Sequence, residues 1–338
     1  MRTLLHTISI MMLTALSAGC AKIEQGSCEV SPHLIGFEVV ENKPSSKAVF
    51  PIDQTFMSAA YMLTSGKTWD ANSADATQYF ANSQEEVKYQ GTYWKTDQDY
   101  YWPLYGGSLT FFSYTPKSVG ATISKDGVSV NGWDVIANKG KVILVADIAK
   151  DKTKNESYAG FSGVPTLFRH KLAKVSFRVA KSAYAEEGIN VRIKSIKIAD
   201  IYTKGNYSRG GYDNDSWSRL SALRNGTNPY VIFQSSTTDG DLLDGTPVVK
   251  GEESIMIPQM LRENDGVHPR VIVEYTTSAD ATVKSTECFF AENFRSGQWL
   301  RGNHYTYTIY IGVGQFPIEF DGSVSTWSSS DMGTVIVQ

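Results

Sequence analysis

The chain has 338 residues, and its 32 basic and 35 acidic residues are interspersed to give a formal net charge of -3 at pH 7. This balance argues against nucleic-acid binding, which usually needs a concentrated basic face. Aromatic residues make up 12% of the chain, Val, Ile and Thr are abundant, and long helix-forming stretches are absent. The composition therefore favours an all-β protein, and the length suits about two domains.

The N-terminus has the features of a bacterial lipoprotein signal. Arg2 supplies a charged start, residues 8–18 are apolar but too short to span a bilayer, and Leu16-Ser-Ala-Gly-Cys20 resembles a lipobox. We expect a signal peptide over residues 1–19, lipidation of Cys20 and a polar tether over residues 20–33. The absence of Asp after Cys20 resembles lipoproteins sent to the outer membrane. The alternative is an ordinary secretory signal that ends near a cysteine.

Two further cysteines, Cys28 and Cys288, lie at opposite ends of the chain. An exported protein can form disulfides, but bridging requires Cα atoms within about 7 Å of each other. We favour two unpaired thiols and keep a single disulfide as the alternative.

The first half of the chain contains a series of short strand patterns. Residues 34–40 predict a strand with Ile35, Phe37 and Val39 on one face, and the Pro- and Ser-containing segment 41–47 predicts an exposed loop. Further strands are expected at 56–63, 109–114 and 142–146.

Two strands are unusually clear, because residues 173–179 and 305–311 alternate apolar with polar side chains. Such alternation favours antiparallel sheets packed face to face. Within 191–201, Ile193 and Ile196 cannot share one face of a regular strand, which predicts a bulge.

The segment 182–188 reads as a short helical or turn connection, and we place a domain boundary after it. Residues 34–188 would then form an N-terminal β-sandwich and residues 189–338 a C-terminal one. The second domain would include strands at 231–234, 254–257, 271–276, 282–291, 305–313 and 334–338.

Chemical motifs are sparse. The five histidines are scattered, Gly160-Phe-Ser-Gly163 lacks the spacing of a nucleophile elbow, and no metal-ligand spacing occurs. Asp213-Asn-Asp215 could begin a calcium loop, but Trp217 stands where a third oxygen ligand belongs, so a turn is the preferred interpretation. No catalytic residue, metal or cofactor is expected.

An aromatic cluster extends from Tyr93 and Trp94 to Tyr100, Tyr101 and Trp102. Exposed on a surface lipoprotein, these rings would stack on sugars and bind glycans. Buried, they would close one end of a sandwich core, which is the more common role of such aromatic residues.

Four motifs resemble those of the fimbrillin family, the type V pilins, in order and spacing across nearly the whole mature chain. They are Tyr101-Trp-Pro-Leu104 with Gly107-Ser-Leu-Thr-Phe-Phe-Ser-Tyr-Thr-Pro116, Phe168-Arg-His-Lys-Leu-Ala-Lys-Val-Ser-Phe177, Met256-Ile-Pro-Gln259 before Val271-Ile-Val-Glu-Tyr275, and Gly302-Asn-His-Tyr-Thr-Tyr-Thr-Ile-Tyr-Ile311 with Val324-Ser-Thr-Trp327. The resemblance implies two tandem transthyretin-like antiparallel β-sandwiches and a function without catalysis.

In that family, a lipidated precursor reaches the outer membrane and a trypsin-like protease removes its first strand. A strand from a neighbouring subunit then fills the groove, and a fimbria that serves cell adhesion grows by this exchange. The resemblance therefore implies other fimbrial subunits as partners, attachment to the outer membrane through lipid, and a host or bacterial surface ligand. The competing function is a surface lipoprotein that binds glycans through Trp94 to Trp102.

Transferred to this chain, the excised strand is residues 34–40 and the cut lies between Lys47 and Ala48. The family's usual residue before the cut is Arg, and here no Arg occurs between Arg2 and Arg169. A protease that accepts Lys would still cut; otherwise the subunit keeps its strand as an anchor or accessory piece, or Lys47 is an ordinary surface residue.

The chain ends in a β-branched segment whose residues would pair with another strand. It is either the last strand of its own domain or the donor strand for a neighbour, and it consists of Thr334, Val335, Ile336, Val337 and Gln338.

Overall fold

The computed structural model describes residues 33–41, 48–91, 93–154, 157–158, 161–185, 187–210, 215–220, 223–262, 266–293, 297–312 and 318–327. They belong to one compact unit, Pro32–Gln338. Cys20, Cys28, Lys47 and the segment Thr334–Gln338 lie outside the described residues, so the roles predicted for them stay predictions.

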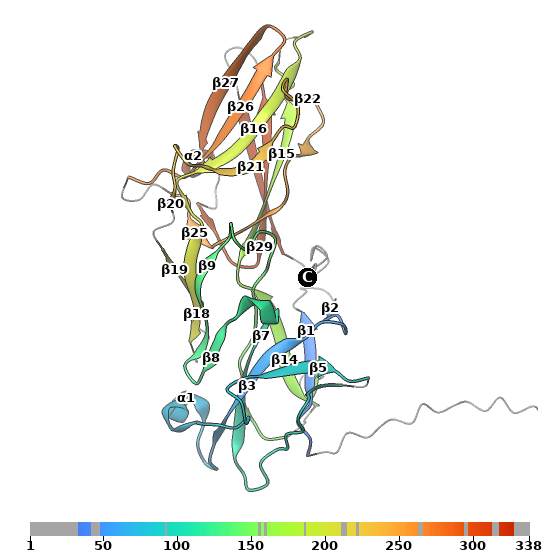
Figure 1. Ribbon diagram of the computed structural model, residues 1–338, viewed down its shortest axis with the longest axis vertical. Coiled ribbons are helices and arrows are strands. Elements are labelled where there is room, and N and C mark those ends of the chain that lie inside the picture. The colour runs from blue at the N-terminus through green and yellow to red at the C-terminus, as the bar shows by residue number, and fades with distance from the viewer. Residues whose placement is uncertain are drawn as a thin grey trace, which may run out of the picture. The chain divides into compact units, whose positions relative to one another are not determined.

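Strands dominate the described residues, which confirms the all-β fold class (Figure 1). The helical elements among them are short: α1 (Trp69–Asn72), α2 (Phe290–Asn293) and two 3-10 turns at Ser73–Asp75 and Lys117–Val119. None of these described helices is long and apolar enough to cross a membrane.

The N-terminal strands form one large sheet in which ten described strands are joined. Its members are β1 (Phe37–Glu41), β2 (Ala48–Val49), β3 (Phe56–Leu63), β4 (Thr77–Gln78), β5 (Glu85–Tyr89), β6 (Trp94–Thr96), β7 (Ser108–Thr115), β10 (Leu144–Ala146), β11 (Ala149–Lys152) and β14 (Val164–His170).

This sheet closes on itself, because β7 pairs with β10 on one side and with β3 on the other. The path β7-β10-β14-β1-β6-β5-β3 therefore returns to its starting strand. Its interior is a core rich in aromatic side chains, and β1 is one of the strands that enclose it.

The later strands form two sheets of five described strands each. One contains β15 (Ala173–Lys181), β23 (Val248–Val249), β24 (Ser254–Met256), β29 (Asn303–Ile311) and β30 (Ile318–Thr326). The other contains β16 (Val191–Ala199), β21 (Tyr230–Gln234), β22 (Asp241–Leu243), β26 (Arg270–Thr277) and β27 (Asp280–Phe289). A second hydrophobic core includes the apolar faces of both sheets.

The remaining described strands make smaller sheets. One joins β8 (Thr122–Ser124), β9 (Gly127–Asp134), β18 (Lys204–Gly210) and β19 (Asp215–Arg219). Two-stranded pairs are β12 (Ser157–Tyr158) with β13 (Phe161–Ser162), β17 (Ile201–Tyr202) with β20 (Leu223–Arg224), and β25 (Gln259–Met260) with β28 (Gln298–Trp299).

Strand pairing crosses the boundary expected after Gly188. Strand β9 pairs with β18, and β15 pairs with β29, β24 and β23. By these pairings β15 belongs with the later strands, and the division at 188/189 stays a prediction.

The two clearest strands of the sequence, β15 and β29, pair with each other over eight residues, but in parallel (Figure 1). Their pairings with β23, β24 and β30 are antiparallel, as the alternation favours. An alternating pattern fixes which side chains share a face and leaves the direction of each neighbouring strand open. The predicted bulge is confirmed: β16 shifts register against β26 between Ile193 and Ser195.

Candidate functional site

The first strand, β1, lies inside the closed N-terminal sheet. It pairs in parallel with β14 over five residues, from Phe37 opposite Val164 to Glu41 opposite Phe168. On its other side Phe37 pairs with Trp94 of β6. Two backbone hydrogen bonds extend this contact, because Ile35 N–H donates to Tyr100 O at 2.8 Å and Trp102 N–H donates to His33 O at 2.7 Å.

The side chains predicted to share one face of this strand all enter the core. Ile35, Phe37 and Val39 are 2%, 2% and 6% exposed. The ring of Phe37 makes edge contacts with Phe56 at 5.5 Å and Phe111 at 5.6 Å between ring centroids. Burying one such side chain stabilises a fold by about 1.5–3 kcal/mol. The three together supply roughly 5–9 kcal/mol, which is comparable with the whole stability of a typical domain.

The strand and the segment before β14 approach closely through two glycines. Val164 N–H donates to Gly36 O at 2.8 Å, and Gly163 has a φ of 144°. A Cβ atom on Gly163 would lie 2.6 Å from Gly36 O. Only glycine fits at position 163, because it tolerates this φ and leaves room for the neighbouring carbonyl.

The segment that carries the predicted cut lies between β1 and β2 in the sequence and outside the described residues. Ala48 begins β2 and pairs with Glu41, and Val49 pairs with Val40. The next residue, Phe50, is fully buried and stacks on Phe168 at 5.2 Å between centroids. A cut before Ala48 would therefore separate β1 from a chain that Phe50 still holds in the core.

Three rings of the aromatic cluster are part of the core, whereas Tyr93 is half-buried and Tyr101 is 50% exposed. Trp94, Tyr100 and Trp102 are 6%, 9% and 3% exposed. Trp94 contacts Phe50 at 5.3 Å and Trp102 contacts Phe111 at 5.8 Å between ring centroids. Sugar stacking on the faces of Trp94 and Trp102 at the surface is incompatible with this burial.

Two other sequence features lack the geometry of a reactive or metal-binding site. Cys288 is a buried free thiol, whose pKa burial raises to about 12. Asp215 of the possible calcium loop begins β19 and forms an ion pair with Lys171 at 3.0 Å, while Asp213 and Asn214 lie outside the described residues. Among the residues that the structure places, no group of three or more His, Cys, Asp or Glu could hold a metal ion.

The sequence did not single out a cluster of Ser176, His304 and Glu253. Ser176 Oγ lies 2.6 Å from His304 Nε2, and the same nitrogen lies 3.9 Å from a Glu253 carboxylate oxygen. A catalytic relay needs the serine and the acid on opposite nitrogens of the imidazole. Because both contacts use Nε2, this arrangement does not form a nucleophile-activating triad.

Comparison with known proteins identifies the family. The family model described as fimbrillin-like matches residues 54–327. Among solved structures, a fimbrial protein from Bacteroides vulgatus ATCC 8482 has a TM-score of 0.60 at 17% identity, with 88% of this chain and 100% of that chain covered. A candidate cell adhesion protein from Parabacteroides distasonis ATCC 8503 has a TM-score of 0.50 at 13% identity, with 88% and 97% covered.

No curated protein matches the chain. At these identities the solved structures establish similarity of fold alone. The family model covers most of the chain, from just before β3 to the residue after β30, and this chain therefore belongs to the fimbrillin-like family.

Proposed function

We propose that this protein is a structural subunit of an adhesive fimbria, that it reaches the outer membrane as a lipoprotein attached through Cys20, and that it polymerises by donor-strand exchange. Membership of the fimbrillin-like family supports a fimbrial structural or adhesion role at the cell surface. The same membership favours a role without catalysis.

The observation that carries the proposal is the position of β1. It is a short strand in a closed sheet, its inner side chains fill an aromatic core, and the sequence that follows it contains a basic residue. Its removal would expose the aromatic interior and the unpaired N–H and C=O groups of β14. A donated strand with apolar residues at alternate positions would restore both.

Lys47 is the residue of the segment between β1 and β2 that suits a trypsin-like protease. The segment contains two lysines, but Lys43 precedes Pro44, and a proline after the basic residue obstructs cleavage by such proteases. Cleavage between Lys47 and Ala48 would discard residues 20–47 together with the lipid. The subunit would then be held in the polymer by its neighbours.

The proposed donor is the C-terminal segment Thr334–Gln338. Its β-branched residues favour an extended conformation, and alternate positions supply apolar side chains to one face. Removal of β1 would take away the core contacts of Ile35, Phe37 and Val39. The emptied groove would therefore accept a strand with the same length and the same alternation of apolar side chains as this segment.

Limited proteolysis tests the proposal. Trypsin added to the purified full chain is expected to produce a new N-terminus at Ala48, followed by a ladder of oligomers that resists SDS. A Lys47→Gln variant is expected to stay intact and monomeric, whereas Lys43→Gln serves as the matched control and should be cut and polymerise normally.

Cleavage at Ala48 without any oligomers would contradict the assembly mechanism, and polymerisation of the uncut Lys47→Gln chain would contradict the processing step. Deletion of residues 334–338 tests the donor directly. The shortened chain is expected to be cut and to melt normally but to stay monomeric; if it unfolds, the segment is a strand of its own domain and the donor assignment is wrong.

A further inference from the structure

A pocket lies beside the end of the β1 groove, where the end of β14 meets the start of β29 and the end of β30, and Phe168, which pairs with Glu41 of β1, is one of its lining residues. Its volume is about 230 Å³, and the side chains that matter for its chemistry are Arg169, Lys171, Arg301, Asn303, Thr326 and Trp327. A dry cavity of about 150 Å³ holds a benzene molecule. This pocket therefore has room for one six-membered ring with its substituents.

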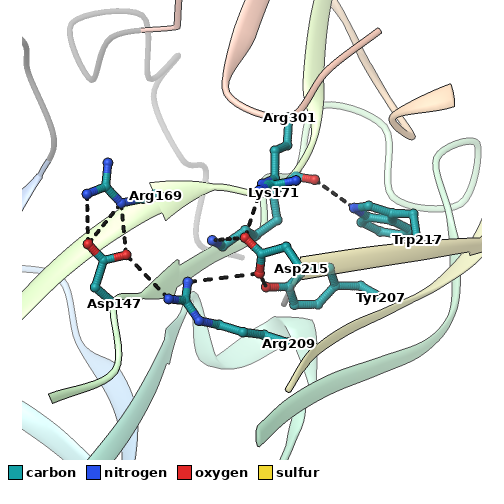
Figure 2. A network of polar contacts seen from close by, with 8 residues as sticks. All are labelled: Asp147, Arg169, Lys171, Tyr207, Arg209, Asp215, Trp217 and Arg301. Atoms are coloured by element: carbon teal, nitrogen blue, oxygen red, sulfur yellow. Dashed lines mark hydrogen bonds and ion pairs between the residues drawn. The ribbon is translucent and has the colours of Figure 1, made fainter. Parts of the chain in front are cut away.

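Three residues that line the pocket, Arg169, Lys171 and Arg301, belong to a network of charged residues (Figure 2). Asp215 is 6% exposed and contacts Lys171 Nζ at 3.0 Å, Arg301 Nε at 3.0 Å and Arg209 Nη1 at 3.9 Å. The Tyr207 hydroxyl also donates to Asp215, at 2.6 Å.

The second carboxylate of the network, Asp147, accepts hydrogen bonds from Arg169 Nε at 2.8 Å and Arg169 Nη2 at 2.7 Å. Arg209 Nη2 lies 3.5 Å from the same carboxylate. The ion pairs of this network thus join four cationic side chains to two carboxylates, an excess of two positive charges. Water screens the charges of Lys171 and Arg209 poorly, because these side chains are 1% and 4% exposed, whereas the charges of Arg169 and Arg301 face the solvent.

The two arginines that line the pocket keep donors for a ligand. Arg169 uses Nε and Nη2 on Asp147, and its Nη1 points away from that carboxylate (Figure 2). Arg301 contacts Asp215 through Nε. Among the described residues, neither Arg169 Nη1 nor the two terminal nitrogens of Arg301 have a partner. These side chains are 41% and 49% exposed, so a ligand from solvent can reach them.

The other wall offers neutral hydrogen-bonding groups beside an aromatic ring. Asn303 and Thr326 are paired across β29 and β30, which places an amide next to a hydroxyl. Trp327 is 3% exposed and stacks on His170 at 3.9 Å between ring centroids. The indole N–H of Trp327 is buried and has no acceptor among the residues that the structure describes. A buried donor of this kind is costly unless an acceptor reaches it.

We propose that this pocket binds a carboxylated sugar, a hexuronic acid residue of a glycan, and so gives the subunit an adhesion site beside its assembly groove. The planar guanidinium groups of Arg169 and Arg301 bind the carboxylate. Asn303 and Thr326 bind ring hydroxyls, and one hydroxyl oxygen accepts from the Trp327 indole.

A carboxylate fits this site better than a neutral sugar, because a neutral ligand would leave the two excess positive charges uncompensated. A carboxylate also matches the forked geometry of a guanidinium, which makes charge-assisted hydrogen bonds with it. The amide, hydroxyl and indole groups would have no role if the ligand were a bare carboxylate.

The test uses the uncut full chain, so its result does not depend on processing or polymerisation. Methyl β-glucuronide and methyl β-glucoside differ only in a carboxylate against a hydroxymethyl group, and their binding is compared by calorimetry or by NMR of the ligand. Saturable binding of the glucuronide, at least about tenfold tighter than that of the glucoside, is expected from a charge-assisted pair.

The variants Arg301→Gln and Arg169→Gln are each expected to weaken glucuronide binding by about tenfold or more. Lys139→Gln is the matched control: it also removes one positive charge from an ion pair, Lys139 with Glu252, but lies outside the pocket, and it should bind as the unmodified chain does. Melting curves confirm that each variant is folded.

Three results would overturn the proposal. They are equal binding of glucuronide and glucoside, unchanged glucuronide binding by both arginine variants, and binding of acetate as tight as that of the glucuronide. A fourth arm uses the peptide Thr-Val-Ile-Val-Gln with a free C-terminal carboxylate. If this peptide competes with the glucuronide for the pocket and binds it more tightly, the site receives a chain end and the sugar assignment is wrong.

Discussion

In the proposed mechanism β1 has two roles: it stabilises the uncut precursor, and it leaves the groove after cleavage. Truncation of Phe37 to alanine separates these two roles. The side chain is 2% exposed and contacts Phe56 and Phe111 at 5.5 and 5.6 Å between ring centroids. Removing a buried phenylalanine ring costs about 3–5 kcal/mol. We expect Phe37→Ala to lower the free energy of unfolding of the uncut chain by that amount, measured by urea denaturation.

The same substitution should accelerate assembly after cleavage. If β1 must leave before or while the donor enters, its weaker binding lowers the barrier, and each 1.4 kcal/mol is a factor of ten in rate. The rate of oligomer formation after trypsin treatment should then rise, by about a hundredfold to a few thousandfold if nearly all of the lost contact energy is felt in the transition state.

Phe177→Ala is the matched control. Phe177 is 1% exposed, lies on β15 and packs in the other core, so its truncation should destabilise the chain by a similar amount. It should leave the rate of laddering of the cut chain unchanged. Equal acceleration by both variants would refute the reasoning, because the effect would then follow global stability instead of release of β1.

Three further predictions concern other parts of the structure. Gly163→Ala should lower the free energy of unfolding by about 2 kcal/mol or more, because residue 163 has a φ of 144° and the added Cβ would lie 2.6 Å from a carbonyl oxygen. Gly245→Ala is the control: its added Cβ meets nothing within 4 Å, so the melting temperature should change little. Asp215→Asn should cost about 3–5 kcal/mol, because the ammonium of Lys171 is 1% exposed and would lose its counter-charge. Burial alone would raise the pKa of the Asp215 carboxyl, but the charge of Lys171 lowers it below its ordinary value. The stability that the Asp215 ion pair contributes is therefore present above the pKa of this carboxyl in the unfolded chain and is lost as the pH falls through its pKa in the folded chain. The Asp215→Asn variant should lack this part of the acid transition. Cys288, whose thiol pKa burial raises to about 12, should resist alkylation at pH 8 until urea unfolds the chain, and rapid labelling of the folded chain would contradict its burial.

The positions and faces of many strands could be predicted from the sequence, because an apolar run between turn residues marks the position of a buried strand and alternation marks its buried face. Residues 56–63 form β3 with the predicted bounds, and the inward face of β1 is the predicted one. Strand β30 was missed: its described side chains from residues 321 to 326 are exposed, and β30 is held as a strand by nine pairings to β29. A strand that is held by backbone pairing alone carries little hydrophobic signal of its own.

The charged pocket could not be predicted from the sequence. Lys171 and Lys174 occur in a segment that resembles a family strand, and lysines in a strand normally indicate its solvent face. Here they are 1% and 2% exposed, because Asp215 and Glu253 compensate their charges across the fold. Those acids are 44 and 79 residues further along the chain, and only folding reveals that each lysine has an anionic partner.

Strand β14 connects the proposed groove to the charged network, and this bears on how an emptied groove would keep its shape. One edge of β14 pairs with β1, and the other pairs with β10 at three positions. Near its end, Arg169 binds Asp147 of the segment between β10 and β11 through two nitrogens, and Lys171 just beyond it is held by Asp215. None of these contacts involves β1. A groove whose main hydrogen-bonding edge is fixed by contacts elsewhere would remain formed after β1 leaves, so a donor strand would not have to order it again, and that lowers the free-energy cost of exchange.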